Sequence, residues 1–409
     1  MKKNPTQIIF YLTTLTLSLL FLVAGNRIAS RNIYQPHQAY APTYYQGIVT
    51  AITDRIQDTS DQWFSGHEII FEARITRGPR RGEVVTARQH ISEMFSVNER
   101  DIEAGDRIVL IHDSFGDRFF FVNYVRINHI IILAAVFLVL VVIFGRRKGI
   151  NGIVSLGLSC AAVFFIFIPA ILSGRNIYIT AVIVCVYAIV STLLLVIGPN
   201  KKALSAMLGC LGGVLLAGLL MYVMDIILGL TGAVSHEATA LLHIPTENPI
   251  NLRAIIFAGV IFGAVGAIMD VAMSIASALW EVREAGGVSD FKTLVKSGIT
   301  IGQDTLGTML NTLILAYIGS SLSLILLIVA HTTSYVELFN MEMIIVELLR
   351  ALIGSFGMLL TIPLTAGICG WFFAVRDDDM GGYSDDDYEE RVKARRERRA
   401  FMAEKGRRI

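Results

Sequence analysis

Residues 254–280 read AIIFAGVIFGAVGAIMDVAMSIASALW, an apolar run in which Asp270 is the single charged residue. A helix of this length rises roughly 40 Å at ~1.5 Å per residue, more than the ~30 Å hydrocarbon core of a bilayer. We therefore expect this run to cross a membrane. Comparable apolar runs lie at 8–24, 129–144, 150–172, 177–198, 203–230, 305–330 and 343–375. The sequence thus predicts an α-helical polytopic membrane protein with about eight spans.

The composition agrees with a membrane protein. Of 409 residues, 54% are hydrophobic and 17% are charged, and this charged share is smaller than a soluble protein normally carries. The 35 basic and 34 acidic residues nearly cancel. The charge balance therefore indicates no nucleic-acid partner, and the partner that we expect first is the lipid bilayer.

Cysteine and histidine usage indicates neither a disulfide framework nor a metal site. All four cysteines lie within apolar runs, where cysteine is usually a small apolar side chain: Cys160, Cys185, Cys210 and Cys369. The polar segment contains His67, His90 and His112, whose spacing matches no metal-ligand motif. We expect no metal and no cofactor.

Basic residues mark every second loop between the apolar runs. With the amino terminus in the cytosol, the cytosolic loops contain Arg146–Lys148, Lys201–Lys202 and Arg283 with Lys292 and Lys296. The charged tail, 377–409, lies on the same side. The other loops, 173–176, 231–253 and 331–340, contain almost no Lys or Arg. Because basic residues concentrate in cytoplasmic loops, both termini are predicted to be cytosolic.

The polar segment 27–128 lies outside the cell in this orientation. Runs rich in Val, Ile, Phe and Tyr predict short strands at Tyr44–Thr53, His67–Thr76, Glu83–His90, Arg107–His112 and Phe119–Arg126. Glu99–Ala104 predicts a short helix before the fourth strand. About five short strands favour a small extracytoplasmic all-β, OB-like barrel. Residues 1–26 before it are interpreted as a membrane anchor, with a cleaved signal peptide as the alternative.

The run at 254–280 has one helical face made only of small and polar residues. At ~100° per residue the members of this face fall within roughly 80° of one another: Gly259, Gly263, Gly266, Asp270, Ser274 and Ser277. Glycines at this spacing are ordinary helix-packing signals. Asp270 is different, because a charge inside a span costs a few kcal/mol and no basic residue shares its run. We expect Asp270 to be functional, either exchanging a proton or binding a cation.

Polar residues also gather in the last two apolar runs. The cytosolic half of these runs contains Asp304, Thr308, Asn311, Thr361 and Thr365, at the depth expected for Asp270. A second layer, nearer the outside, contains Asp225, Glu347 and Arg350, with Gly354 as a further helix-packing candidate. Structural alternatives remain for some of these residues. Asp304 is a candidate helix N-cap, and Glu347 and Arg350, three residues apart, can neutralise each other.

Two polar layers at different depths are what an alternating-access transport pathway needs. The favoured function is an ion- or proton-coupled permease for a small solute or ion, with its pathway among the last three spans. The alternative is a membrane scaffold, a possible homo-oligomer whose outer domain recruits envelope proteins. No Gly-x-Ser-x-Gly, phosphate loop or metalloprotease motif is present, so an enzyme is not expected. The segment 288–301 predicts an amphipathic helix on the inner leaflet, or a helix packed under the bundle.

Three stretches carry a family resemblance: 263–278 (GAVGAIMDVAMSIASA), 301–317 (IGQDTLGTMLNTLILAY), and 350–365, which begins RALIGS and closes on IPLT. Together with the layout of anchor, outer domain and polytopic region, they resemble the YibE/F-like family. The resemblance implies a bacterial multi-pass protein of the plasma membrane and points to the same polar positions. It implies no particular substrate and no catalytic residue.

Overall fold

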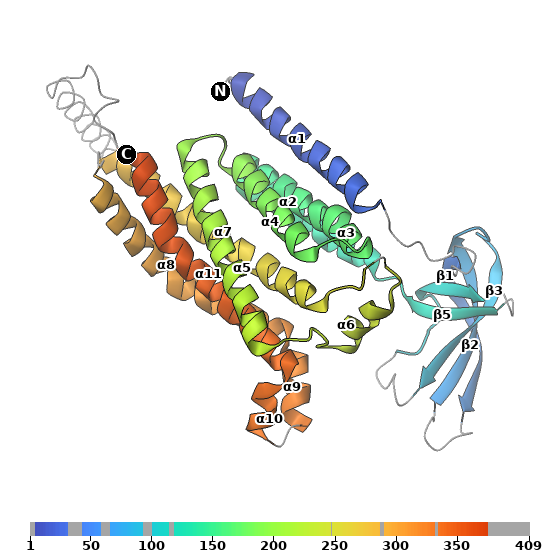
Figure 1. Ribbon diagram of the computed structural model, residues 1–409. Helices are drawn as coiled ribbons and strands as arrows, with labels where there is room; N and C mark the ends of the chain where they lie inside the picture. The colour runs from blue at the N-terminus through green and yellow to red at the C-terminus, as the bar shows by residue number, and fades with distance from the viewer. Residues whose placement is uncertain are drawn as a thin grey trace, which may run out of the picture. The chain divides into compact units, whose positions relative to one another are not determined.

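A computed structural model describes residues 5–31, 43–58, 66–92, 100–113, 118–246, 248–286, 290–331 and 334–374 (Figure 1). The charged tail predicted at 377–409 lies outside these residues. The chain divides into two compact units, 1–34 with 151–409 and 35–150. The second unit contains a β domain and the first is a helical bundle, as the change in sequence character at 27–128 predicts.

The β domain is a closed five-stranded barrel in the order β1-β2-β3-β5-β4. Its strands are β1 (Thr43–Asp58), β2 (Gly66–Arg77), β3 (Val84–Ser92), β4 (Arg107–Asp113) and β5 (Arg118–Tyr124). The long β1 contains irregularities in its pairing and joins both β2 and β4, so it bends around the barrel. The barrel closes where β3 and β5 pair in parallel, at Ala87 with Phe119. The predicted small all-β domain is confirmed.

Alternation along the strands fills the barrel. On β2, Phe71, Ala73 and Ile75 point inward and are buried, while the residues between them are exposed. Ile108 and Leu110 of β4 complete the core. The short helix predicted at 99–104 is wrong in its described part, because residues 100–103 are irregular and a turn follows at Ala104 and Gly105.

The buried polar side chain of Gln89 organises the segment that precedes β4. The amide of Gln89 donates to the carbonyl of Arg100 and accepts from the backbone N–H of Ile102, both at 3.1 Å. Tyr124 donates its hydroxyl to the same carbonyl of Arg100 at 2.6 Å. Because Gln89 is 1% exposed, both ends of its amide need these partners.

The helical elements are α1 (Pro5–Ala29), α2 (Ile127–Ala162), η2 (Val163–Phe167), α3 (Ile168–Leu172), α4 (Ile177–Val196), α5 (Lys201–Leu228), α6 (His236–Ala240), η3 (Leu241–His243), α7 (Leu252–Gly286), α8 (Phe291–Ser320), α9 (Leu322–His331), α10 (Tyr335–Asn340) and α11 (Glu342–Phe373). Among the described residues, six helices are long and apolar enough to cross a membrane. The bent pair α8 and α9, at 63° to each other, makes seven if it counts as one span.

The apolar stretch Ile127–Leu172 accounts for the difference from the eight runs of the sequence. It counts as one candidate span of 46 residues, whereas the sequence divides it near residues 145–149. The helix is interrupted at this place, because Arg146 has φ 49° and ψ −126°. A Cβ built on Gly149 would collide with the carbonyl oxygen of Val141. These residues lie about 12 Å apart along a straight helix, so the chain bends sharply here.

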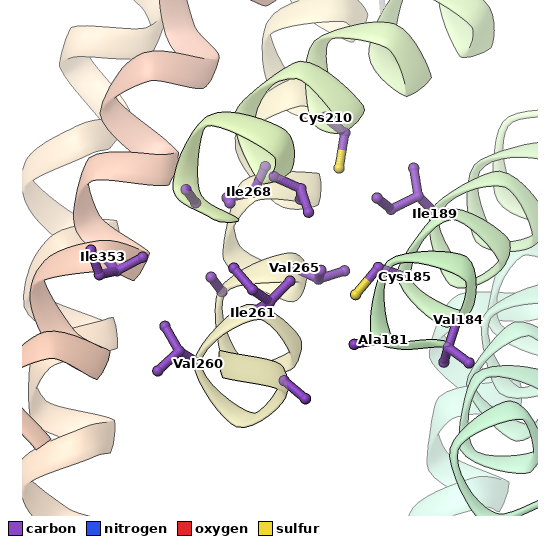
Figure 2. Close-up of a cluster of buried hydrophobic side chains, with 14 of the residues drawn as sticks. Ala181, Val184, Cys185, Ile189, Cys210, Val260, Ile261, Val265, Ile268 and Ile353 are labelled. Carbon is purple, nitrogen blue, oxygen red and sulfur yellow. The ribbon is translucent and has the colours of Figure 1, made fainter. Parts of the chain in front are cut away.

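The core of the bundle is formed around α7, which packs against α4, α5, α8 and α11 (Figure 1). Small side chains allow this close packing, since Ala264, Ala272 and Ala276 are completely buried. In Figure 2, Cys185 of α4 points toward Ile261 and Val265 of α7. Cys185, Cys210 and Cys369 are buried in this core and act as apolar packing residues. Cys160 is exposed.

Helix α1 also packs on the bundle. Its Phe21 stacks on Tyr187 of α4 with ring centroids 4.5 Å apart, and Gly25 lies against Ile166 of η2. A helix with such contacts is part of the folded bundle and more than a tether. The interpretation of residues 1–26 as a membrane anchor stays a prediction.

Polar residues at loop ends set where the helices begin. Asn176 and Asn200 accept hydrogen bonds from the first turns of α4 and α5. Asp290 does the same for α8, so α8 begins at Phe291 and includes most of the predicted amphipathic segment. Leu294 is fully buried, and Phe291 lies against Gly370 of α11. The first turns of α8 therefore pack against α11, and the choice between an inner-leaflet helix and a helix under the bundle stays a prediction.

Candidate functional site

The small and polar face of α7 points away from the helical core. Gly259, Gly263, Gly266 and Asp270 are exposed, and Ser274 and Ser277 are half-buried. A Cβ built on Gly259 or Gly266 would have nothing within 4 Å. At Gly263 the same Cβ would meet the hydroxyl of Tyr317 at 2.6 Å. Within one chain, therefore, Gly263 permits close packing and the other two glycines face open space.

The opposite face of α7 explains this orientation. Ile268, Val271 and Ile275 are completely buried against neighbouring helices. The apolar side chains of α7 supply most of the packing surface, and the polar stripe is left exposed at Gly259, Gly266 and Asp270. Asp270 belongs to this stripe near the middle of the candidate span Leu252–Glu284.

A second exposed polar stripe runs along α8. Asp304, Thr308 and Asn311 are all exposed, and a Cβ on Gly307 would have nothing within 4 Å. Asp304 lies well inside α8 and does not cap it, because the N-cap is Asp290. Thr308 returns its hydroxyl to the carbonyl of Thr305 at 2.9 Å.

The two stripes lie at the same depth. α7 and α8 are antiparallel, since Gly298 lies against Leu279 and Gly302 against Ile275. Counting five residues back from Ile275 gives Asp270, and counting five residues forward from Gly302 gives Gly307. Asp270 is therefore level with Gly307, one residue before Thr308. Asp270 and the polar residues of α8 are therefore level with each other along the two helices, and their depth in a membrane stays a prediction.

Thr361 and Thr365 belong to a different environment. Both are completely buried in the contact between α11 and α5. A Cβ on Gly213 would collide with the hydroxyl of Thr361, and one on Gly209 with that of Thr365. Thr361 donates to the carbonyl of Gly357 at 2.7 Å. The structure therefore separates these threonines from the exposed stripes of α7 and α8. The four-residue spacing of Gly209 and Gly213 is the signal that sequence reasoning missed.

The outer polar layer contains an ion pair and an unpartnered hydroxyl. Arg350 donates to Glu347 at 2.7 Å, as the structural alternative predicts, and both side chains are partly buried. Tyr317 of α8 lies near this pair, and within the described residues its buried hydroxyl has no hydrogen-bond partner. A Cβ on Gly354 would lie 3.6 Å from that hydroxyl. Tyr317 is a functional candidate that the sequence did not indicate.

Asp225, the third residue of the predicted outer layer, lies apart from the cluster of Glu347, Arg350 and Tyr317. It is 7% exposed at the end of α5, and its Oδ1 has no hydrogen-bond partner among the described residues. Arg253 and Glu342 lie close enough to act on it electrostatically. Glu342 itself accepts hydrogen bonds from the backbone N–H groups of Thr231 and Gly232, which fixes the loop after α5 to the start of α11.

These groups have the chemistry for binding a small cation or carrying a proton. A carboxylate, amide and hydroxyl oxygens are hard ligands, and they lie on helices rather than in one enclosed cage. Among the described residues no three His, Cys, Asp or Glu side chains are grouped to hold a metal ion. His67 of the barrel is instead paired with Asp101 at 2.9 Å.

Comparison with known proteins identifies a family for the helical part of the chain. Residues 133–375 match the model of a family described as YibE/F-like protein. No curated protein matches the chain, and no solved structure does. The matched region begins inside α2 and continues to the residue after the last described one, so it covers both polar stripes.

Proposed function

The chain belongs to the YibE/F-like protein family, and we propose that it is a plasma-membrane permease coupled to an ion or a proton. The observation that carries the proposal is Asp270, exposed on the small-residue face of a membrane-spanning helix. A carboxylate facing hydrocarbon costs a few kcal/mol or more, so water or protein has to cover it. A water-lined pathway along α7 and α8 removes this cost and brings a solute to Asp270, Thr308 and Asn311.

The proposed topology has eight spans and cytosolic termini. The bend at Arg146 supports two crossings within Ile127–Leu172, with Arg146, Arg147 and Lys148 on the cytosolic side. The barrel then lies outside the cell. Its strand order and parallel β3–β5 pair are consistent with an OB-like barrel, a fold that binds extended ligands on its strands and loops. We propose that it captures solute, gates the exit or docks an envelope protein.

The alternative function is a scaffold formed by two copies of the chain. The uncovered glycines Gly259 and Gly266 favour it, because small residues four to seven apart let helices of different chains approach closely. In a scaffold the second copy covers Asp270, and no aqueous pathway is needed.

Cysteine accessibility separates the two functions. In a background without the four native cysteines, Ser274→Cys and Ser277→Cys are treated with a membrane-impermeant maleimide in right-side-out and inverted vesicles. A permease predicts labelling that changes with an imposed pH or sodium gradient. Protection under every condition, together with cross-linking of Gly259→Cys between chains, would favour the scaffold. Thr365→Cys is the matched control and should stay protected, because Thr365 is buried against Gly209.

Flux measurements test the role of Asp270 directly. The full chain is reconstituted with a pH-sensitive dye inside proteoliposomes, and currents are recorded after steps of proton, sodium or potassium concentration. Asp270→Asn should abolish the response that the wild type gives. Asp290→Asn makes the same chemical change at the N-cap of α8 and should retain the response. Normal flux through the Asp270→Asn variant would refute the proposal.

A further inference from the structure

An apolar cavity of about 510 Å³ lies between α4, α5 and α7, a volume typical of small-molecule sites. Its wall consists largely of aliphatic and aromatic side chains: Val182, Val186, Leu211, Leu215, Phe257 and Ile261. Cys185, Ile189 and Ile261 in Figure 2 form part of this wall. The wall contains none of the polar residues of the proposed transport pathway. It is a separate site.

The cavity extends lengthwise from one end of the bundle. Its lining on α4 runs from Asn176, the N-cap, to Ile189, which is roughly 20 Å along a helix. One leaflet of hydrocarbon is about 15 Å thick, half of the ~30 Å core. The cavity therefore reaches from the membrane surface to slightly beyond the middle. Ile179 and Leu219 on its flanks are each 60% exposed, so it opens sideways toward lipid.

Polar groups occur at the surface end of the cavity. The lining there includes Asn176, Tyr178 and Tyr222, and the two tyrosine rings meet edge to face at 6.2 Å. Tyrosine is enriched at the headgroup level of membranes. Arg253 does not line the cavity, but it lies on α7 one helical turn before Phe257 of the wall, and its side chain is exposed. An apolar channel with tyrosines and an arginine at its mouth complements an apolar chain with an anionic headgroup.

The dimensions favour an occupant narrower than a helix. A helix about 10 Å wide occupies roughly 1,600 Å³ over 20 Å of length, which is more than the empty space of about 1170 Å³ in the cavity with its open side included. A single hydrocarbon chain is narrow enough to fit. Gly218 is part of the wall on α5, and a Cβ built there would lie 3.5 Å from the ring of Phe257, at ordinary contact distance. A larger side chain at Gly218 would project into the cavity.

We propose that this cavity binds one acyl chain of a phospholipid, with the phosphate held near Arg253. The lipid belongs to the outer leaflet in the proposed topology, because Asn176 and Arg253 are in loops predicted to be outside. The proposal does not depend on whether the protein transports a solute.

Photolabelling tests the proposal on the full chain in nanodiscs. The probe is a phosphatidylglycerol with a diazirine halfway along one acyl chain, added in trace amount to phosphatidylethanolamine and phosphatidylglycerol. After irradiation, adducts mapped by peptide mass spectrometry should concentrate at cavity residues such as Val186 and Leu215. Leu204, an exposed residue of α5 that does not line the cavity, reports labelling by surrounding lipid.

Filling the cavity supplies the decisive comparison. Gly218→Leu should lower labelling at Val186 and Leu215 several-fold and leave labelling at Leu204 unchanged. Gly157→Leu is the matched control, because Gly157 is an exposed helical glycine with nothing within 4 Å of a built Cβ. If Gly218→Leu does not fold, Val182→Phe fills the cavity from its open side and should give the same loss. The proposal would be overturned if Val186 and Leu215 were labelled no more than Leu204. It would also be overturned if the filling substitutions left their labelling unchanged.

The headgroup contact has its own test. Arg253→Gln should lower labelling by the phosphatidylglycerol probe but not by a diacylglycerol probe with the same diazirine chain. Equal effects on both probes would refute the role of Arg253 in holding the phosphate.

Discussion

Replacing Gly213 with alanine adds a methyl group at the closest contact between α5 and α11. The new Cβ would collide with the hydroxyl of Thr361, and would lie 3.1 Å from the Cβ of Thr361 and 3.2 Å from Ile268. Overpacking of this kind costs about 1–3 kcal/mol, whereas alanine in place of glycine inside a helix gains about 1 kcal/mol. We expect Gly213→Ala to range from neutral to about 2 kcal/mol less stable.

Two controls test whether the collision with the Thr361 hydroxyl causes the loss of stability: Gly212→Ala and Thr361→Ala. At Gly212 a Cβ would meet only the end of the Leu364 side chain, at 3.1 Å, and that side chain can move. Gly212→Ala should therefore be neutral or stabilise by up to about 1 kcal/mol. Thr361→Ala removes the colliding hydroxyl, so the double variant with Gly213→Ala should recover about 1–3 kcal/mol relative to additivity.

The free energy of unfolding is measured by SDS titration in mixed micelles, followed by circular dichroism, for the wild type, the single variants and the double variant. The same preparations are assayed for flux. If the two substitutions add within about 0.5 kcal/mol, the close contact of Gly213 and Thr361 is refuted. If Thr361→Ala folds normally and yet loses flux, Thr361 belongs to the pathway and its burial in the packing is not its whole role.

Three further predictions follow from particular hydrogen bonds. Gln89→Leu leaves the buried backbone N–H of Ile102 without a partner, which costs about 1–3 kcal/mol, so hydrogen exchange of that amide should accelerate; an unchanged rate would count against the bond. Hydrogen bonds from the side chain and backbone of Thr293 lower the pKa of Asp290, so its capping contribution is present above the ordinary aspartate pKa and is lost as the pH falls through the lowered value. The thermal midpoint difference between wild type and Asp290→Ala should therefore shrink on acidification, and a constant difference would contradict it. Because the hydroxyl of Thr365 has no partner among the described residues, Thr365→Val should keep full stability and flux, and a loss of flux with normal folding would return Thr365 to the pathway.

The barrel strands were predicted well from the sequence, because a strand is recognised from the alternation of residues within it. Each predicted strand overlaps an observed one, since alternating β-branched and aromatic residues need only their own neighbours to be recognised. The order of the strands in the barrel depends on pairings such as Ala87 with Phe119, far apart in the chain. No local pattern contains that information.

The polar stripe of α7 was predicted, but not the direction in which it faces. Periodicity shows that Gly259 and Asp270 share a face, and it does not tell whether that face meets protein, water or lipid. In a soluble protein the apolar face would be the buried one, whereas in a bilayer both faces of a helix can be apolar. Periodicity likewise places Thr361 and Thr365 on the same face of α11 as Glu347. It does not show that both threonines are buried, because their burial depends on the neighbouring residues of α5.

The bend at Arg146 has a consequence for how the chain enters the membrane during synthesis. Gly149 contacts the carbonyl of Val141, so the two ends of the apolar stretch at the bend are in contact before any other helix is needed. A bend formed by residues this close in the chain can form as soon as residues 141–149 have been synthesised. The basic cluster Arg146–Lys148 lies at this bend, and in the proposed topology it would hold the bend on the cytosolic side. In the proposed topology, this one bend would therefore help to set the orientation of the spans that follow it, early in translation.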